Sequence, residues 1–258
     1  MMKKIRLLTL FILLLLFPSV ANFLNLQAQD TFAYEQLLNN RVLLAQIDKE
    51  NTLRQEFALR GLTYPPKAIY LQAFKKEGLL EIWVLTEQGI YAKFKEYTIC
   101  TSSGKLGPKR IQGDGQVPEG FYYINKFNPV SSFYLSLGIN YPNDSDRIFG
   151  GYNPLGGDIY IHGDCKSVGC LPLTNEKMKE VYWLAVMACN NGQYRPPVHI
   201  FPMRFSNTEL YMREYAKATT STQRLWENIK LGYDYFEANR TLPPIWVGGD
   251  GYYRFNTY

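Results

Sequence analysis

Charged residues, cysteine and histidine are all scarce in this sequence. Only 20% of the 258 residues are charged and 46% are hydrophobic, which excludes a largely disordered chain. Lys and Arg nowhere form a cluster interleaved with aromatic residues, so we expect no nucleic-acid binding. Internal repeats and low-complexity segments are also lacking. The length allows one large domain or one domain with helical extensions, and we expect the second.

The sequence has one long hydrophobic run, and that run is too short to cross a bilayer comfortably. Lys3, Lys4 and Arg6 precede a largely apolar stretch at 7–17, which proline and small residues follow. This order is typical of a secretory signal peptide, whereas a membrane span needs about 20 apolar residues. We predict a signal peptide at 1–28 and no stable membrane span after its cleavage, with an uncleaved anchor as the alternative. No cysteine lies near the run to carry a lipid.

The pattern after this segment changes twice. Apolar residues recur at helical intervals between Tyr34 and Arg60, and Pro65 and Pro66 then favour an extended connection. We place a domain boundary at this point. The predicted parts are a helical segment at 31–64, a sheet domain at 65–205 and a C-terminal helical extension at 206–258.

Short β-branched and aromatic runs predict the strands of the middle part. They lie at 69–74, 79–86, 90–100, 121–127, 133–137, 159–161 and 198–201. We predict one helix that begins after Thr174 as N-cap and ends near Asn190, and a second between Thr222 and Asn239. The residues at 128–157 have the pattern of long loops. The stretch at 102–120 is long for a hairpin loop, so it is a candidate for a loop over a functional site.

The reactive side chains gather in one short stretch at 159–170. His162, Cys165 and Cys170 follow a predicted strand, in a loop that contains several glycines. A thiol near its free pKa of ~8.5 needs a neighbouring base to be a good nucleophile, and His162 is the obvious candidate for Cys170. Gly169 allows a tight backbone whose N–H groups can bind an oxyanion. The dipole of the helix after Thr174 is expected to lower the pKa of Cys170.

Other interpretations of these residues stay open at this point. His162, Cys165 and Cys170, with or without Cys189, have ligand types and a spacing that suit a structural zinc ion. Cys165 could instead form a disulfide with Cys170, or with Cys100 or Cys189, since four cysteines allow three complete pairings.

The second histidine, His199, lies on a predicted strand and is expected to be structural. Asp164 is expected to be a solvated loop residue rather than the partner that orients His162.

The stretch Ile161-His162-Gly163, followed by Ser167-Val168-Gly169-Cys170, resembles the catalytic signature of the L,D-transpeptidase (YkuD-type) superfamily. The short spacing and the extra Cys165 are similar to its YafK-like branch. A second stretch, Val117-Pro118-Glu119-Gly120-Phe121-Tyr122, resembles the family's Pro-x-Gly-aromatic strand entry. The resemblance covers about 67–205, a little over half of the chain.

This resemblance implies a fold, a reaction and a set of roles. The fold would be mainly β, an L,D-transpeptidase-type β-sandwich with helices added at the N- and C-terminal ends. Cys170 would attack the carbonyl at the L-centre of a diamino acid in a peptidoglycan stem peptide, forming a thioester, with His162 as base. The Gly163 carbonyl would orient the imidazole, the N–H groups of Gly169 and Cys170 would form the oxyanion hole, and Ser167 would support the loop.

The resemblance also implies partners and a location. Peptidoglycan stem peptides would be the substrate, a wall-attached lipoprotein is a further possible partner, and no metal or cofactor is expected. The protein would act in the periplasm of a Gram-negative bacterium.

Two departures from the family pattern leave the acyl acceptor open. Val168 stands where most members have a second histidine, and Leu171-Pro172 stands where they have a branched residue and Arg or Asn. An amine acceptor would give cross-linking and a lipoprotein lysine would give attachment. Water would give cleavage, as by an L,D-carboxypeptidase or an amidase that releases wall-bound protein. A different class of function, a zinc-stabilised or inactive cell-wall-binding module, is the remaining alternative.

Overall fold

The structure is a computed structural model that describes residues 31–256. The signal peptide predicted at 1–28 lies outside the described residues. The described part starts with a helix at 31–37 and continues in α2 (Asn40–Leu59). The helix predicted between Tyr34 and Arg60 is thus interrupted at 38–39. The interruption arises because the Asn39 side chain accepts the Arg41 N–H (3.0 Å) and caps a new helix.

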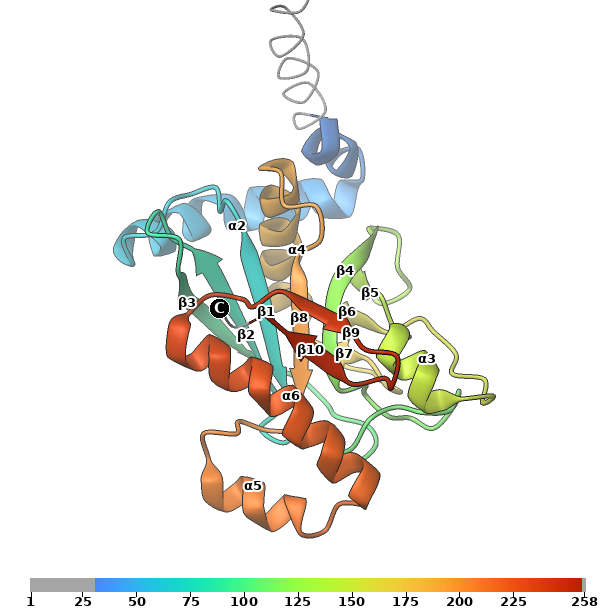
Figure 1. The fold of residues 1–258 in the computed structure, drawn as a ribbon. Coiled ribbons are helices and arrows are strands. Elements are labelled where there is room, and N and C mark those ends of the chain that lie inside the picture. Colours follow the sequence, from blue (N-terminus) through green and yellow to red (C-terminus); the bar gives the residue numbers. More distant parts are fainter. Residues whose placement is uncertain (1–30, 257–258) are drawn as a thin grey trace, which may run out of the picture.

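A mixed sheet of eight strands forms the centre of the fold (Figure 1). The strand order is β3-β2-β1-β8-β4-β5-β6-β7. The first half of β4 pairs with β8 and its second half pairs with β5, so the sheet curls at this strand. The strands are β1 (Ile69–Phe74), β2 (Leu79–Leu85), β3 (Tyr91–Thr98), β4 (Gly120–Asn128), β5 (Ser136–Ile139), β6 (Tyr160–His162), β7 (Leu171–Pro172) and β8 (Pro197–Phe201).

Helices cover both faces of this sheet. All residues of β1 are buried, because successive side chains point to opposite faces and both faces are packed. Leu71 belongs to the core that contains α2 and α4 (Asn175–Asn190). Phe74 belongs to the core that contains residues of α6 (Thr220–Asn239), a helix that crosses the sheet in Figure 1. Thr174 caps α4 as predicted, since its side chain accepts the Lys177 N–H.

Several elements differ from the prediction. The predicted loop at 128–157 contains α3 (Asp144–Gly150), which a reciprocal capping box of Asn143 and Asp146 starts. The strand predicted at 133–137 begins later, at Ser136, because Tyr134 adopts a left-handed backbone (φ 71°). The C-terminal extension adds α5 (Thr208–Tyr215) and a hairpin of β9 (Ile245–Val247) and β10 (Tyr253–Phe255).

The predicted fold class, a sheet-based domain with helices added on its N- and C-terminal sides, is confirmed. The domain limits at 64/65 and 205/206 stay predictions. Among residues 31–256, no helix combines the length and the apolar character that a membrane crossing requires.

Candidate active site

Cys170 and His162 line one cavity of about 270 Å³. The parallel pairing of β6 and β7 brings them together, because His162 ends β6 and Cys170 directly precedes β7. The loop between β4 and β5 forms another wall. The lining residues are Asn128, Ser131, Ser132, Phe133, Ser136, Asp158, Tyr160, His162 and Cys170.

The His162 imidazole is buried and held by its neighbour. Its Nδ1 lies 2.6 Å from the Gly163 carbonyl oxygen, so this nitrogen donates and the lone pair lies on Nε2. Burial lowers the pKa of His162, while the Gly163 carbonyl and the Asp164 charge oppose that shift. The ring centroid of Phe133 lies 4.7 Å from that of the imidazole. The histidine is therefore a neutral base at neutral pH with a fixed tautomer.

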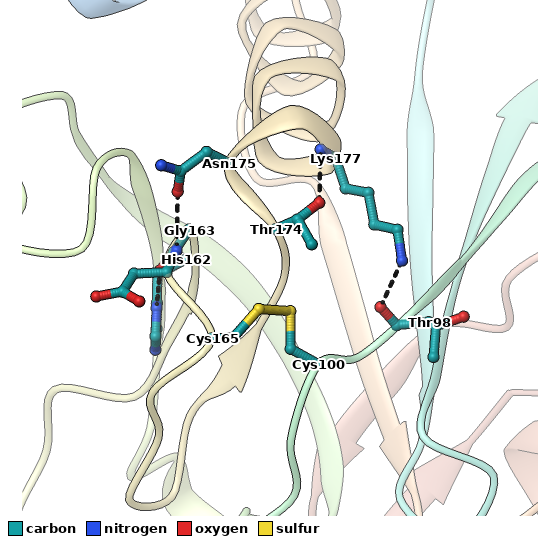
Figure 2. Close-up of a disulfide and its surroundings, with 9 residues drawn as sticks. Thr98, Cys100, His162, Gly163, Cys165, Thr174, Asn175 and Lys177 are labelled. Carbon is teal, nitrogen blue, oxygen red and sulfur yellow. Dashed lines mark hydrogen bonds between the residues drawn. A yellow bond between two sulfur atoms is a disulfide. The ribbon is translucent and has the colours of Figure 1, made fainter.

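The glycine after this histidine is required by close packing. A Cβ atom at Gly163 would lie 2.5 Å from the Asn175 Oδ1 and 3.1 Å from the Phe133 carbonyl oxygen. The same Asn175 oxygen accepts the Asp164 N–H (2.9 Å), which ties the loop to the first turn of α4 (Figure 2). Asp164 itself is partly exposed, as expected. A larger residue at 163 would displace the carbonyl that holds the imidazole.

Cys170 is half-buried, and its sulfur lies against the backbone of the segment before β6. The Sγ atom lies 3.6 Å from the Asp158 carbonyl oxygen. Burial raises the pKa of the thiol, and the Asp158 charge adds to that rise. The net effect of these surroundings is a raised pKa, and the lowering contribution of the α4 dipole stays a prediction. No hydrogen bond within residues 31–256 joins the thiol to His162, so the resting pair is a thiol beside a neutral imidazole.

The two backbone N–H groups predicted for an oxyanion hole are occupied by serine hydroxyls. The Cys170 N–H donates to the Ser167 Oγ (2.9 Å), and that hydroxyl also contacts the Cys170 carbonyl (2.9 Å). The Gly169 N–H donates to the Ser103 Oγ (2.6 Å). Gly169 has a φ of 99°, and a Cβ there would lie 3.0 Å from the Gln116 carbonyl oxygen. The hole stays a prediction that requires both N–H groups to leave these hydroxyls.

Ser103 is a residue that sequence reasoning missed. It belongs to the stretch at 102–120, whose length predicts a loop over a functional site. The length of this stretch was therefore the available signal. A buried ion pair between Glu119 and Lys75 (2.9 Å) anchors this stretch, and Glu119 also accepts the Trp226 Nε1–H (2.7 Å). Gly120 of the same motif has no room for a side chain, since a Cβ would lie 2.3 Å from the Tyr253 hydroxyl. The strand-entry motif thus fixes the loop against the C-terminal extension.

A disulfide joins Cys100 to Cys165, with a Cα–Cα distance of 5.2 Å. Figure 2 shows it between the segment after β3 and the loop after His162, below the first turn of α4. It selects one of the pairings that the sequence left open and corrects two interpretations. The proposed zinc site loses Cys165 as a thiolate ligand, and a bond between Cys165 and Cys170 is wrong. Cys189 is free, and burial raises the pKa of its thiol to about 12.

The N-terminal helical segment reaches the wall of the cavity. The Arg41 guanidinium donates to the Ser131 and Tyr134 carbonyl oxygens, each at 2.6 Å. These two carbonyls flank Phe133, whose ring packs on His162. Sequence reasoning missed Arg41, because nothing near it in the chain indicates a partner about 90 residues away.

His199 lies outside this site. It is buried on β8, with ring centroids of Tyr70 and Phe121 each 4.6 Å away. Burial lowers the pKa of His199 to about 3. It lines a different cavity, so only His162 of the two histidines lies beside Cys170.

Comparison with solved structures gives weak likenesses. The helical cell shape determining protein Pgp2 of Campylobacter jejuni is 19% identical, with a TM-score of 0.42 over 70% of this chain and 73% of that one. A second Pgp2 structure is 23% identical, with a TM-score of 0.42 over 58% of this chain and 55% of its own. Bd1075 of Bdellovibrio bacteriovorus is 19% identical, with a TM-score of 0.38 over 60% of this chain and 59% of that one.

Comparison of sequences is more decisive. The family model of the L,D-transpeptidase catalytic domain (YkuD) matches residues 77–200. The YafK protein of Escherichia coli (strain K12), whose name assigns it to the L,D-transpeptidases, is 38% identical over 182 residues. These residues are 69% of this chain and 70% of that protein. The chain therefore belongs to the YkuD family of L,D-transpeptidase catalytic domains, as the signature around His162 and Cys170 predicted.

Proposed function

We propose that this protein is a cysteine acyltransferase of peptidoglycan stem peptides, with Cys170 as nucleophile and His162 as general base. The contact that carries the proposal is the 2.6 Å hydrogen bond from His162 Nδ1 to the Gly163 carbonyl, beside Cys170 in one cavity. It leaves Nε2 as the acceptor of a proton, which a thiol with a raised pKa needs. Membership of the YkuD family supports the choice of peptidoglycan as substrate.

In the first half-reaction, His162 Nε2 takes the thiol proton as Sγ attacks the carbonyl carbon at the L-centre of the diamino acid. The C–N bond to the next residue breaks, and its nitrogen takes the proton from the imidazolium. The acyl group remains on Sγ as a thioester. In the second half-reaction an amine or water gives a proton to His162 and attacks the thioester carbonyl. The sulfur then leaves and regains its proton from the imidazolium.

The negative oxygen of each tetrahedral intermediate would bind the N–H groups of Gly169 and Cys170. These groups donate to the Ser103 and Ser167 hydroxyls in the resting structure. The oxyanion accepts charge-assisted bonds that are stronger than those to a neutral hydroxyl, so the exchange favours the intermediate. Ser103 and Ser167 would therefore hold the loop ready between turnovers.

We place this reaction in the periplasm, after removal of the segment at 1–28, and assign the catalytic domain to 65–205. The free thiol of Cys170 and the Cys100–Cys165 disulfide coexist in one site, which fits an oxidising compartment. The acceptor decides between cross-linking, attachment of a lipoprotein and hydrolysis. The geometry of Cys170 and His162 is common to all three.

Turnover of purified muropeptides, followed by mass spectrometry, tests the proposal. Cys170→Ala and His162→Ala should each abolish turnover, because the first removes the attacking atom and the second removes the proton acceptor. Cys189→Ala is the matched control, since this second free cysteine lies outside the cavity. Full turnover by Cys170→Ala would refute the assignment. Cross-linked dimers, protein-linked fragments and trimmed monomers would each identify a different acceptor.

If the protein is instead an inactive cell-wall-binding module, the same assay gives a different result. The unsubstituted chain would bind muropeptides without changing them, and Cys170→Ala would bind equally well. Reaction of iodoacetamide with Cys170 faster than with Cys189 would support the enzyme, because only the first thiol faces a cavity with a base.

A further inference from the structure

A second cavity, of about 860 Å³, lies where the sheet meets the C-terminal hairpin. Its walls come from β4, β8, the residues before α3 and the segment that forms β9 and β10. The volume is within the range of binding sites for ligands of several hundred daltons. Cys170 and His162 do not line it, so it is separate from the proposed catalytic cavity.

A histidine that lines this cavity makes ring contacts but has no hydrogen-bond partner among residues 31–256. His199 is only 4% exposed, and no hydrogen bond to its ring occurs among residues 31–256. Since burial lowers its pKa to about 3, the imidazole is neutral, with one N–H donor and one nitrogen acceptor. The ring nitrogens are not among the fully buried, unpaired side-chain atoms of residues 31–256, which fits a ring that is reached from the cavity and can pair with a polar ligand there. A wholly apolar ligand would leave it unpaired.

The other lining groups include aromatic rings and uncharged amides, together with the charged side chains of Asp144, Arg147 and Arg195. Trp246 of β9 is 53% exposed, and the Arg195 guanidinium stacks on the Tyr123 ring at 4.6 Å. Asn125 also lines the cavity, and Asn140 uses its side-chain oxygen to accept the Tyr123 N–H (2.8 Å), which leaves its NH₂ group for a ligand. Sugar rings present an apolar C–H face to aromatic side chains and hydroxyl or acetamido groups to amides. This set therefore matches an N-acetylated amino sugar.

β5 leads from the catalytic cavity toward this cavity. Ser136 of β5 lines the Cys170 cavity, and Asn140, which directly follows the end of β5 at Ile139, lines the large cavity. The four-residue spacing corresponds to about 13 Å. An extended peptide of about four residues covers the same length. Gly138 lies between them, and a Cβ there would lie 3.0 Å from the Tyr160 ring, 3.1 Å from the Lys126 Cβ and 3.3 Å from the Asn125 Oδ1, so these side chains cover the strand between the two cavities.

We propose that the large cavity binds the amino-sugar strand of peptidoglycan while the attached stem peptide reaches Cys170. This inference rests on the proposed function, because it deepens the choice of substrate. It also assigns a role to the C-terminal extension, whose hairpin supplies Trp246 and one wall of the site. A substrate would then be recognised by its glycan as well as by its peptide.

Tryptophan fluorescence tests the site directly. Trp246 is the exposed member of the four tryptophans, since Trp83, Trp183 and Trp226 are 7%, 1% and 1% exposed. The full chain with Cys170→Ala is titrated with a peptide-free tetramer of N-acetylglucosamine. We expect a saturable change in emission. By calorimetry, Trp246→Ala should weaken binding at least about tenfold, which is about 1.4 kcal/mol.

Tyr152→Ala is the matched control, because Tyr152 is an exposed aromatic residue outside the cavity. It should bind the tetramer as the parent does. The absence of a saturable signal, or equal affinity of the parent and Trp246→Ala, would overturn the glycan site. Glycan binding without turnover of muropeptides by the unsubstituted chain would instead refute the proposed function alone.

Discussion

Removal of the Cys100–Cys165 disulfide should cost both stability and catalytic rate. The bond closes a loop with a sequence separation of 65 residues, and the chain-entropy model assigns about 4 kcal/mol of stabilisation to a loop of that length. The bond also holds Ser103, three residues after Cys100, against the N–H of Gly169. Replacing both cysteines with serine avoids a new free thiol beside Cys170.

Urea denaturation of the parent and of the Cys100→Ser/Cys165→Ser variant measures the first effect. We expect a loss of about 4 kcal/mol in the free energy of unfolding. The second effect is a fall in kcat/KM of up to about tenfold, since one hydrogen bond contributes roughly 0.5–1.5 kcal/mol. Ser103→Ala separates the two effects, because it removes the hydroxyl and keeps the disulfide. A variant that lost less than about 1 kcal/mol and kept its rate would refute the reasoning.

Four further predictions concern the site and its supports. The kcat/KM of the parent should fall only as the pH drops below about 6.5, because burial lowers the pKa of His162 and the protonated imidazole accepts no proton. In Asp164→Asn a pH–rate profile should place this fall at still lower pH, since the Asp164 charge raises that pKa. Arg41→Ala should lower kcat/KM on muropeptides with circular dichroism unchanged, because the loop that packs on His162 loses two hydrogen bonds. Glu119→Gln should reduce the free energy of unfolding in urea by about 3 kcal/mol, because it leaves the buried Lys75 charge unpaired.

Local pattern was sufficient for the strands and helices with strong periodicity. The strands at 69–74 and 79–86 follow from short β-branched and aromatic runs and the helix after Thr174 from its capping residue and apolar stripe, which involve only near neighbours in the chain. The helix at Asp144–Gly150 was missed because its start resembles a turn, with Tyr-Pro-Asn before it. Its capping box of Asn143 and Asp146 was the signal that could have revealed it.

The active site shows the same limit of prediction from local sequence pattern. The sequence placed a histidine and a cysteine in one loop and gave no means to judge their hydration. The structure buries His162 and half-buries Cys170, which lowers the pKa of the first and raises that of the second. Burial is the largest influence on the thiol pKa, and the sequence did not reveal it. A pKa depends on the surroundings in three dimensions, and spacing along the chain does not determine them.

The sequence by itself determined the family, the sheet-based fold and the pair of residues at the centre of the proposed chemistry. These rest on a compact signature around His162 and Cys170 and on periodic patterns. The tertiary structure alone decided that Cys165 pairs with Cys100, that Ser103 meets Gly169 and that Arg41 supports the cavity wall. The physical reason is distance along the chain. These partners lie 65 to 90 residues apart, and their contact depends on how the strands and helices pack around the sheet.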